Sequence, residues 1–378
     1  MAGLVVLSGT TFYPQVDDDV QYHYFLWATL VLRHGLLPWK SFPVDYPPGV
    51  LPLMILPGGT KAYELEFIVL ALVADALVAR TLARSGAASS GLWGWVLLPV
   101  LLGPVMWVRL DVFVAAAIMG FVRAVERRRW LLAGLCVAAA TLLKLWPAVL
   151  LVLIFPIVER RGWLRAATTA GVSVAVATGP VLAWGGGAGL WAMLRTQGGR
   201  GLEVETLWAA PAVLAHALGA TVAITEGEGS PEILIPGWAL WIGSALLPAL
   251  LLILFAWLWR IRARGVPVPI VVAAGAALVL VGAKVLSPQY VVWAAAAVLL
   301  ALDGVPEGGQ RRRVLLLTTG ALAATTQWLY PFAYQGIESS STASQLAVGF
   351  HAAALLTWVF AVLVTLGQIP SGESPALA

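Results

Sequence analysis

The sequence predicts an all-α protein, a polytopic bundle of transmembrane helices, from its composition and from its recurring apolar runs. Hydrophobic residues make up 60% of the 378 positions and charged residues 11%, whereas a soluble domain carries about 25% charged residues. The mean hydropathy is +0.88. Apolar runs near the length of a membrane-spanning helix, about 20 residues, recur along the chain.

These apolar runs define the predicted spans. In chain order they are residues 62–83, 90–107, 110–125, 130–143, 146–158, 163–184, 236–259, 267–283, 288–302, 314–330 and 345–367. Residues 1–13 are a short candidate for one more span, since they form only about 20 Å of helix against a hydrocarbon core of about 30 Å. We therefore expect 11–12 spans within one integral membrane domain, residues 1–378.

Arginine clusters at alternate ends of these spans orient the chain. They comprise Arg80 and Arg84; Arg123, Arg127, Arg128 and Arg129; Arg160, Arg161 and Arg165; Arg260, Arg262 and Arg264; and Arg311, Arg312 and Arg313. Because cytoplasmic loops are enriched in Lys and Arg, we predict a multi-pass protein of the cell (plasma) membrane with this face inside. The opposite, acidic face carries two loops, 14–61 and 185–235, which are long enough to suggest function.

Composition and spacing also exclude several kinds of site. The net charge of +4 comes from the arginine clusters, which anchor topology, so we predict no nucleic-acid partner. Cys136 is the single cysteine and excludes an internal disulfide or a cysteine-built metal site. The four histidines and the carboxylates show no metal-ligand spacing. No bound metal or other cofactor is expected.

Five segments on the outer face place polar residues beside apolar spans. They are VDDDVQYHYF and its continuation to YPPG, WVRLDVF, LLKLWP, RTQGGRGLEVETLWAAP and GAKVLSPQYVVW. Ionisable residues at a membrane border are costly and are therefore functional candidates. Lys144, Lys284, Arg200 and Arg109 are suited to hold a phosphate or diphosphate. A carboxylate of the run 17–19 is suited to act as a general base, with a pKa that we expect to be raised by its low-dielectric surroundings.

Each of these residues also has a structural interpretation. Lys144 and Lys284 are also explained as snorkelling side chains, and Glu203 and Glu205 as members of a solvated loop. Asp45 is suited to cap the YPPG turn. Asp75, inside a predicted span, is better explained by hydrogen bonding between helices than by chemistry. His23 and His34 are explained as ordinary interfacial residues.

Taken in order, several segments resemble glycosyltransferase family 87, the polyprenol-phosphate-mannose-dependent mannosyltransferases of the GT-C superfamily. The matching pieces are DVQYHYFLWA, LLPW, VDYPPG, RLDVFVAA, AGLCVAAATLLKLWPAVLL, QGGRGLEVETLW and KVLSPQYVVW. The resemblance implies a GT-C fold with short amphipathic helices in long outer loops. It also implies an inverting transfer of a hexose, most often mannose, from a polyprenol-phosphate donor. The acceptor would be a glycolipid or glycan of the cell envelope, reached outside the cytoplasm.

The resemblance also assigns roles to residues. The base would be Asp19, with Asp18 and Asp17 as alternatives because the triple run leaves the register open. Donor phosphate and sugar would be contacted by Lys144, Lys284, Arg200, Arg109, Tyr22, Tyr24, Gln289 and Tyr290. Acceptor or sugar contacts would come from Asp45, Tyr46, Asp111, Glu203 and Glu205. Members of this class usually work without a bound metal.

Two other functions compete with this interpretation. A transporter or lipid-linked-sugar flippase predicts charges at mid-bilayer and paired broken helices in two related halves. Only Asp75 is deep in a span, and no relation between halves is visible. A non-catalytic membrane assembly protein has no need of the cations on the outer face.

Overall fold

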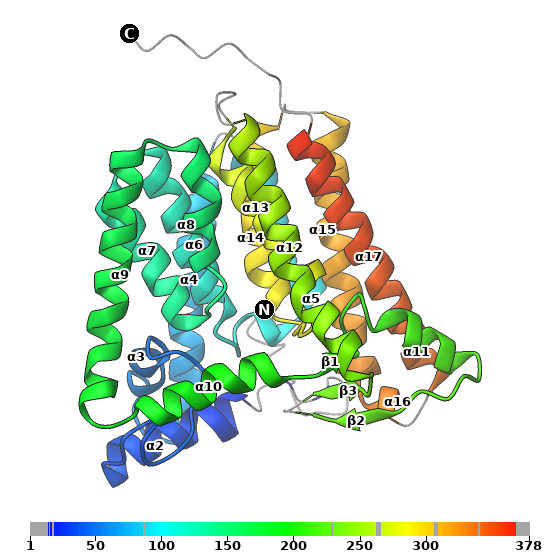
Figure 1. Cartoon of the computed structure of the whole chain (residues 1–378), viewed down its shortest axis with the longest axis horizontal. Helices are drawn as coiled ribbons and strands as arrows, with labels where there is room; N and C mark the ends of the chain where they lie inside the picture. Colours follow the sequence, from blue (N-terminus) through cyan, green and yellow to red (C-terminus); the bar gives the residue numbers. More distant parts are fainter. Residues whose placement is uncertain are drawn as a thin grey trace.

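The computed structural model describes residue 14, residue 16 and residues 19–85, 88–227, 230–261, 266–305, 309–338 and 341–367. The candidate first span, 1–13, and two of the candidate bases, Asp17 and Asp18, lie outside this part of the chain. The described chain is an all-α bundle with one small sheet. Its helices run lengthwise between two ends, and short elements gather at one of them (Figure 1).

Every predicted span from residue 62 onward coincides with a helix. The helices at these spans are α4 (Tyr63–Ala83), α5 (Ala88–Leu102), α6 (Asp111–Glu126), α7 (Trp130–Leu143), α8 (Ala148–Ile154), α9 (Arg160–Ala183), α12 (Gly237–Ile261), α13 (Val268–Gly282), α14 (Tyr290–Ala301), α15 (Gln310–Gln327) and α17 (Thr342–Gly367). Three helices, α9, α12 and α17, are long and apolar enough to cross a membrane by length and composition alone. Shorter apolar helices, including α13 and α14, pack between them. The predicted fold class is confirmed.

The two long loops hold the short elements. The first carries η1 (Asp19–Tyr24), a π-helical turn, followed by α2 (Phe25–His34) and α3 (Val50–Ile55). The second carries α10 (Gly187–Gly199), β1 (Leu202–Glu203), α11 (Ala210–Ala217), β2 (Ile224–Glu226) and β3 (Pro231–Ile233). The strands form an antiparallel sheet in the order β1-β3-β2, which the sequence analysis did not predict. The remaining short elements are η2 (Pro104–Met106), η3 (Phe155–Ile157), η5 (Leu302–Gly304), η6 (Trp328–Ala333) and α16 (Gln335–Glu338).

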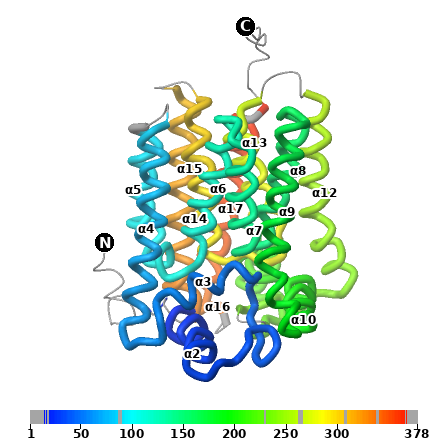
Figure 2. Tube along the Cα trace, turned by 90° about the vertical axis from the view of Figure 1, so that its left-hand side faces the viewer, coloured from blue at the N-terminus to red at the C-terminus, as the bar shows by residue number. Residues whose placement is uncertain are grey.

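The bundle therefore has two chemically different ends. The described arginine clusters lie where α4, α6 and α12 end and where α9 and α15 begin; we call this the arginine end. At the opposite end, the loop end, α2, α10 and the sheet lie together (Figures 1 and 2). The arginine clusters, which alternate along the sequence with the outer loops, thus lie together at one end of the bundle, and the outer loops lie at the other.

Burial distinguishes the central helices from the peripheral ones. In α13 and α14 almost every side chain is buried, and both pack against other helices on all sides. In α9 and α12 few residues of the apolar stretch are buried, although both helices are strongly apolar. An apolar surface of this extent is expected of helices that contact lipid.

Small residues bring α7 and α9 close together. A Cβ atom added at Gly134 would lie 2.5 Å from the backbone oxygen of Ala166 and 2.6 Å from Cβ of Thr169. Glycine therefore permits this close approach, as small residues do between membrane helices.

Gly134→Ala is expected to lower the thermal unfolding midpoint in detergent, because overpacking of this kind costs about 1–3 kcal/mol. The control is Gly171→Ala in α9, where an added Cβ meets nothing within 4 Å and the higher helix propensity of alanine favours a small gain. Equal midpoints for the two variants would contradict the proposed close contact.

Candidate active site

The loop end contains a cavity of about 1430 Å³. Its walls come from η1, α2, the loop 35–49, the turn before α6, the α7–α8 turn, α10, the sheet, the first half of α12, the α13–α14 loop and η6. The predicted site residues that line it are Asp19, Asp45, Tyr46, Arg109, Lys144, Arg200, Glu203, Glu205, Lys284, Gln289 and Tyr290. The chain therefore brings segments more than 250 residues apart in sequence to one hollow.

Asp19 begins η1, and both of its carboxylate oxygens have partners. Oδ2 pairs with Nη1 of Arg109, and Oδ1 lies 3.2 Å from Nδ1 of His23. Burial alone would raise the pKa of Asp19, but Arg109 and His23 outweigh it and the pKa is lowered from its ordinary value. The expected raised pKa was wrong, because that argument considered the low dielectric and omitted the neighbouring cations.

Arg109 is held in a turn between η2 and α6. Gly103, with φ +80°, ends α5 and turns the chain, and the indole of Trp107 then donates to Asp75 Oδ2 at 3.1 Å. Asp75 also accepts a hydrogen bond from Trp95 at 2.5 Å. Asp75 therefore forms hydrogen bonds between helices, as predicted from its position inside a span. Through Trp107 it anchors the segment that carries Arg109. Nη2 of Arg109 donates to the Tyr330 hydroxyl at 3.2 Å.

Lys144 directly follows α7 and ends the helix, because its own backbone is extended, with φ −147° and ψ 134°. Its Nζ lies 2.8 Å from Oδ1 of Asp111 and 3.9 Å from the centroid of the Tyr290 ring. Asp111 is 1% exposed and does not line the cavity. In this structure Asp111 is the counter-ion of Lys144, not a residue facing an acceptor.

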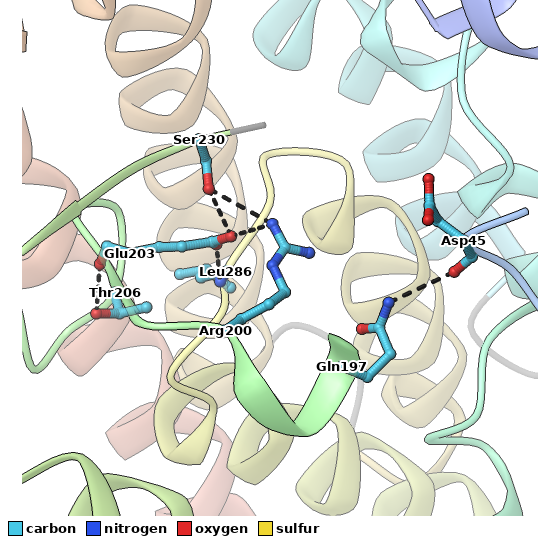
Figure 3. Close-up of polar contacts among 7 residues, drawn as sticks. All are labelled: Asp45, Gln197, Arg200, Glu203, Thr206, Ser230 and Leu286. Atoms are coloured by element: carbon cyan, nitrogen blue, oxygen red, sulfur yellow. Dashed lines mark hydrogen bonds and ion pairs between the residues drawn. The ribbon is translucent and has the colours of Figure 1, made fainter. Parts of the chain in front are cut away.

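Arg200 and Glu203 form the centre of a polar cluster at the end of α10 (Figure 3). They pair with each other, and Glu203 also accepts hydrogen bonds from the Ser230 hydroxyl and from the Leu286 amide, both at 2.7 Å. Glu203 is 1% exposed. The interpretation of this segment as a solvated loop is therefore wrong, because these bonds tie the loop to β3 and to the α13–α14 connection.

Two more ionisable groups complete the polar wall. Glu205 is buried, and burial together with the neighbouring Glu203 raises its pKa well above the ordinary range, which favours the protonated form. Nζ of Lys284 donates to the Gly198 carbonyl at 2.7 Å and makes no ion pair within the described residues. Burial lowers the pKa of Lys284.

Comparison with family models shows to which family the chain belongs. The family model of glycosyltransferase family 87 matches residues 45–288, which is more than half of the chain. The chain belongs to glycosyltransferase family 87. No curated protein matches the chain. This membrane glycosyltransferase acts on a sugar donor and an acceptor, so the interpretation as a transporter or an assembly protein is set aside.

The family match covers most of the cavity but not all of it. Arg109, Lys144, Arg200 and Lys284 lie within the matched residues, whereas Asp19 precedes them. The family match therefore does not bear on the predicted role of Asp19 as a base. That prediction depends on the position of Asp19 in the cavity and on the resemblance of the segment DVQYHYFLWA to family 87.

Two predicted aromatic residues do not line the cavity. Tyr22 is 60% exposed and does not belong to the residues that line the cavity. Tyr24 is fully buried and packs against Phe67 at 5.4 Å and Tyr46 at 6.1 Å between ring centroids. Tyr24 thus supports the wall of the site from behind.

Other cavity residues escaped the sequence analysis. They are His23, Trp27, Trp146, Gln197, Ser230, Glu226, Glu232, Tyr330 and Tyr334. His23 was interpreted as interfacial, although its spacing of four from Asp19 was visible in the sequence. Tyr330 lies in η6 and Tyr334 directly follows it; no motif in the sequence gave a signal for this segment. No group of three potential metal ligands occurs among the described residues.

Proposed function

We propose that this family 87 enzyme transfers a hexose, mannose, from a polyprenol-phosphate donor to a glycolipid or glycan of the cell envelope. Transfer proceeds with inversion on the extracytoplasmic side of the plasma membrane. The observation that carries the proposal is a cavity that holds the Asp19 carboxylate, whose pKa is lowered, together with the cations Arg109, Lys144, Arg200 and Lys284. A phosphate leaving group and an acceptor hydroxyl need this combination of groups.

The cavity also suits a donor carried by a lipid. Its volume of about 1430 Å³ exceeds the 300–1,000 Å³ typical of pockets for one small ligand, which leaves room for a donor head group and an acceptor sugar together. Two residues of α12, Leu247 and Pro248, line the cavity. The outer surface of this helix is apolar and exposed. A polyprenyl chain would meet this helix on leaving the cavity.

The chemistry assigned to each group follows from its charge. The Asp19 carboxylate takes the proton as the acceptor O–H bond breaks, and the acceptor oxygen bonds to the anomeric carbon. The bond from that carbon to the phosphate oxygen breaks on the opposite face, and the phosphate keeps the electron pair. Cations placed beforehand stabilise this charge without reorganisation. Lys284 is the first cation we assign to the phosphate, since it makes no ion pair within the described residues, whereas Lys144, Arg109 and Arg200 each pair with a carboxylate. Arg200 is assigned together with Lys284 because its charge acts on Lys284 and its guanidinium has five N–H donors, more than the pair with Glu203 uses.

The sidedness follows from the separation of charge along the bundle. The arginine end corresponds to the cytoplasm by the excess of basic residues on that side, so the cavity opens on the other side. Nucleotide sugars are absent there, which favours a donor that crosses the membrane on a lipid.

The test is a donor comparison with purified protein in liposomes. Radiolabelled polyprenol-phosphate-mannose, polyprenol-phosphate-glucose and a nucleotide-activated mannose are each supplied with a crude envelope-lipid acceptor pool. We expect labelled product only from the lipid-phosphate donors, with mannose preferred. Product formed from the nucleotide sugar, or from no lipid-phosphate donor, would contradict the proposal.

A further inference from the structure

His23 is the cavity residue whose contacts the proposed chemistry leaves unused. It follows Asp19 by four positions in η1, and the wide turn of a π-helix places both side chains on one face; π-helical turns often occur at functional sites. Nδ1 lies 3.2 Å from Oδ1 of Asp19, and the ring lies beside Trp27 with centroids 5.9 Å apart. The side chain is 57% exposed, against 23% for Asp19. His23 therefore connects the carboxylate to solvent.

The charges around His23 come from three segments. Asp19 belongs to its own turn, Asp45 to the loop 35–49 and Arg109 to the turn before α6. The hydrogen bond to Asp19 raises the pKa of His23 against the opposing effect of burial, and the nearby charge of Asp45 adds to the increase while that of Arg109 reduces it. His23 is thus charged over a wider pH range than a free histidine.

Arg109 and His23 each contact a different oxygen of the Asp19 carboxylate. Arg109 holds Oδ2 and His23 holds Oδ1, so removal of His23 leaves Oδ1 without its hydrogen-bond donor. Each carboxylate oxygen has a second lone pair, so both contacts persist while the acceptor hydroxyl approaches.

We propose that His23 is a positioning residue that orients the Asp19 carboxylate toward the acceptor hydroxyl. This inference rests on the proposed role of Asp19 as the base. At the pH where Asp19 takes up a proton, His23 is fully charged, so its whole effect acts there. Without that charge, Asp19 becomes protonated at a higher pH, and the acid side of the activity profile moves upward. At alkaline pH His23 is neutral in the native protein as well, and the difference shrinks.

The activity test compares His23→Ala, His23→Gln and native protein from pH 3 to pH 9. We expect His23→Ala to shift the acid limb of kcat/KM upward by about one pH unit, a tenfold loss on that limb, with a smaller loss at the optimum. His23→Gln restores a hydrogen-bond donor but no charge, so we expect recovery at the optimum and the same shifted limb. The control is His34→Ala, an exposed residue at the end of α2. A uniform loss at every pH in His23→Ala would overturn the proposal.

A second measurement is independent of transfer activity. The chain has four histidines, so the side-chain signals of ¹⁵N-histidine-labelled protein can be assigned by single substitutions and followed by NMR against pH. We expect the titration midpoint of His23 to fall in Asp19→Asn and to stay unchanged in Asp303→Asn. An unchanged midpoint in Asp19→Asn would overturn the coupling. A lowered midpoint in Asp19→Asn, together with native protein that transfers no sugar, would instead reject the proposed function and leave the coupling intact.

Discussion

Asp19→Asn is expected to reduce transfer by about 10²–10⁴-fold, the usual contribution of a positioned general base. The substitution keeps the size of the side chain and one oxygen for Arg109 but removes the proton acceptor. Initial rates of lipid-phosphate-mannose transfer measure the effect, and an unfolding midpoint well above the assay temperature shows that the fold persists.

Matched aspartates provide the controls for Asp19→Asn. Asp303 pairs with Arg123 at the arginine end, far from the cavity along the bundle, so Asp303→Asn should retain transfer. Asp17→Asn and Asp18→Asn test the register of the triple run, and we expect nearly native rates from both. Loss confined to Asp17→Asn or Asp18→Asn, with Asp19→Asn active, would move the base to that residue and contradict this account.

Asp111→Asn is expected to destabilise the protein by about 3–5 kcal/mol, because it leaves the ammonium of Lys144 without its buried counter-ion. The Asp111 side chain is 1% exposed and that of Lys144 is 10% exposed, so water replaces the lost partner poorly. Unfolding in detergent by heat or denaturant measures the change.

The double variant Asp111→Leu/Lys144→Met separates stability from function. Replacing both charges by apolar groups is expected to recover most of the lost stability. If Lys144 serves only as the partner of Asp111, transfer also recovers, and this is the result we expect from the assignment of phosphate to Arg200 and Lys284. A stable double variant with a greatly raised KM for the donor would instead show that Lys144 contacts the phosphate.

The helices and the grouping of the arginine clusters at one end could be predicted because both depend on local sequence. A run such as 236–259 is apolar over a full membrane thickness, and α12 (Gly237–Ile261) follows it almost to the residue. The arginine clusters at alternate ends fixed which helix ends lie together. Neither inference requires knowledge of contacts between distant residues.

Several residues that line the cavity could be named from the sequence, but their pairings could not. Lys144, Arg200 and Lys284 were recognised because charge beside an apolar span is costly. Their counter-ions depend on tertiary packing: Asp111 reaches Lys144 from another helix, and Glu203 turns inward only because Ser230 and Leu286 satisfy it. The lowered pKa of Asp19 has the same origin, since Arg109 is 90 residues away in the sequence.

The most direct measurement is an electron cryo-microscopy structure with a non-hydrolysable polyprenyl-phosphonate mannose bound. This account predicts the phosphonate between Arg200 and Lys284, the lipid chain along α12 and the anomeric carbon facing Asp19. A phosphonate at the arginine end, or one whose sugar faces away from Asp19, would contradict it.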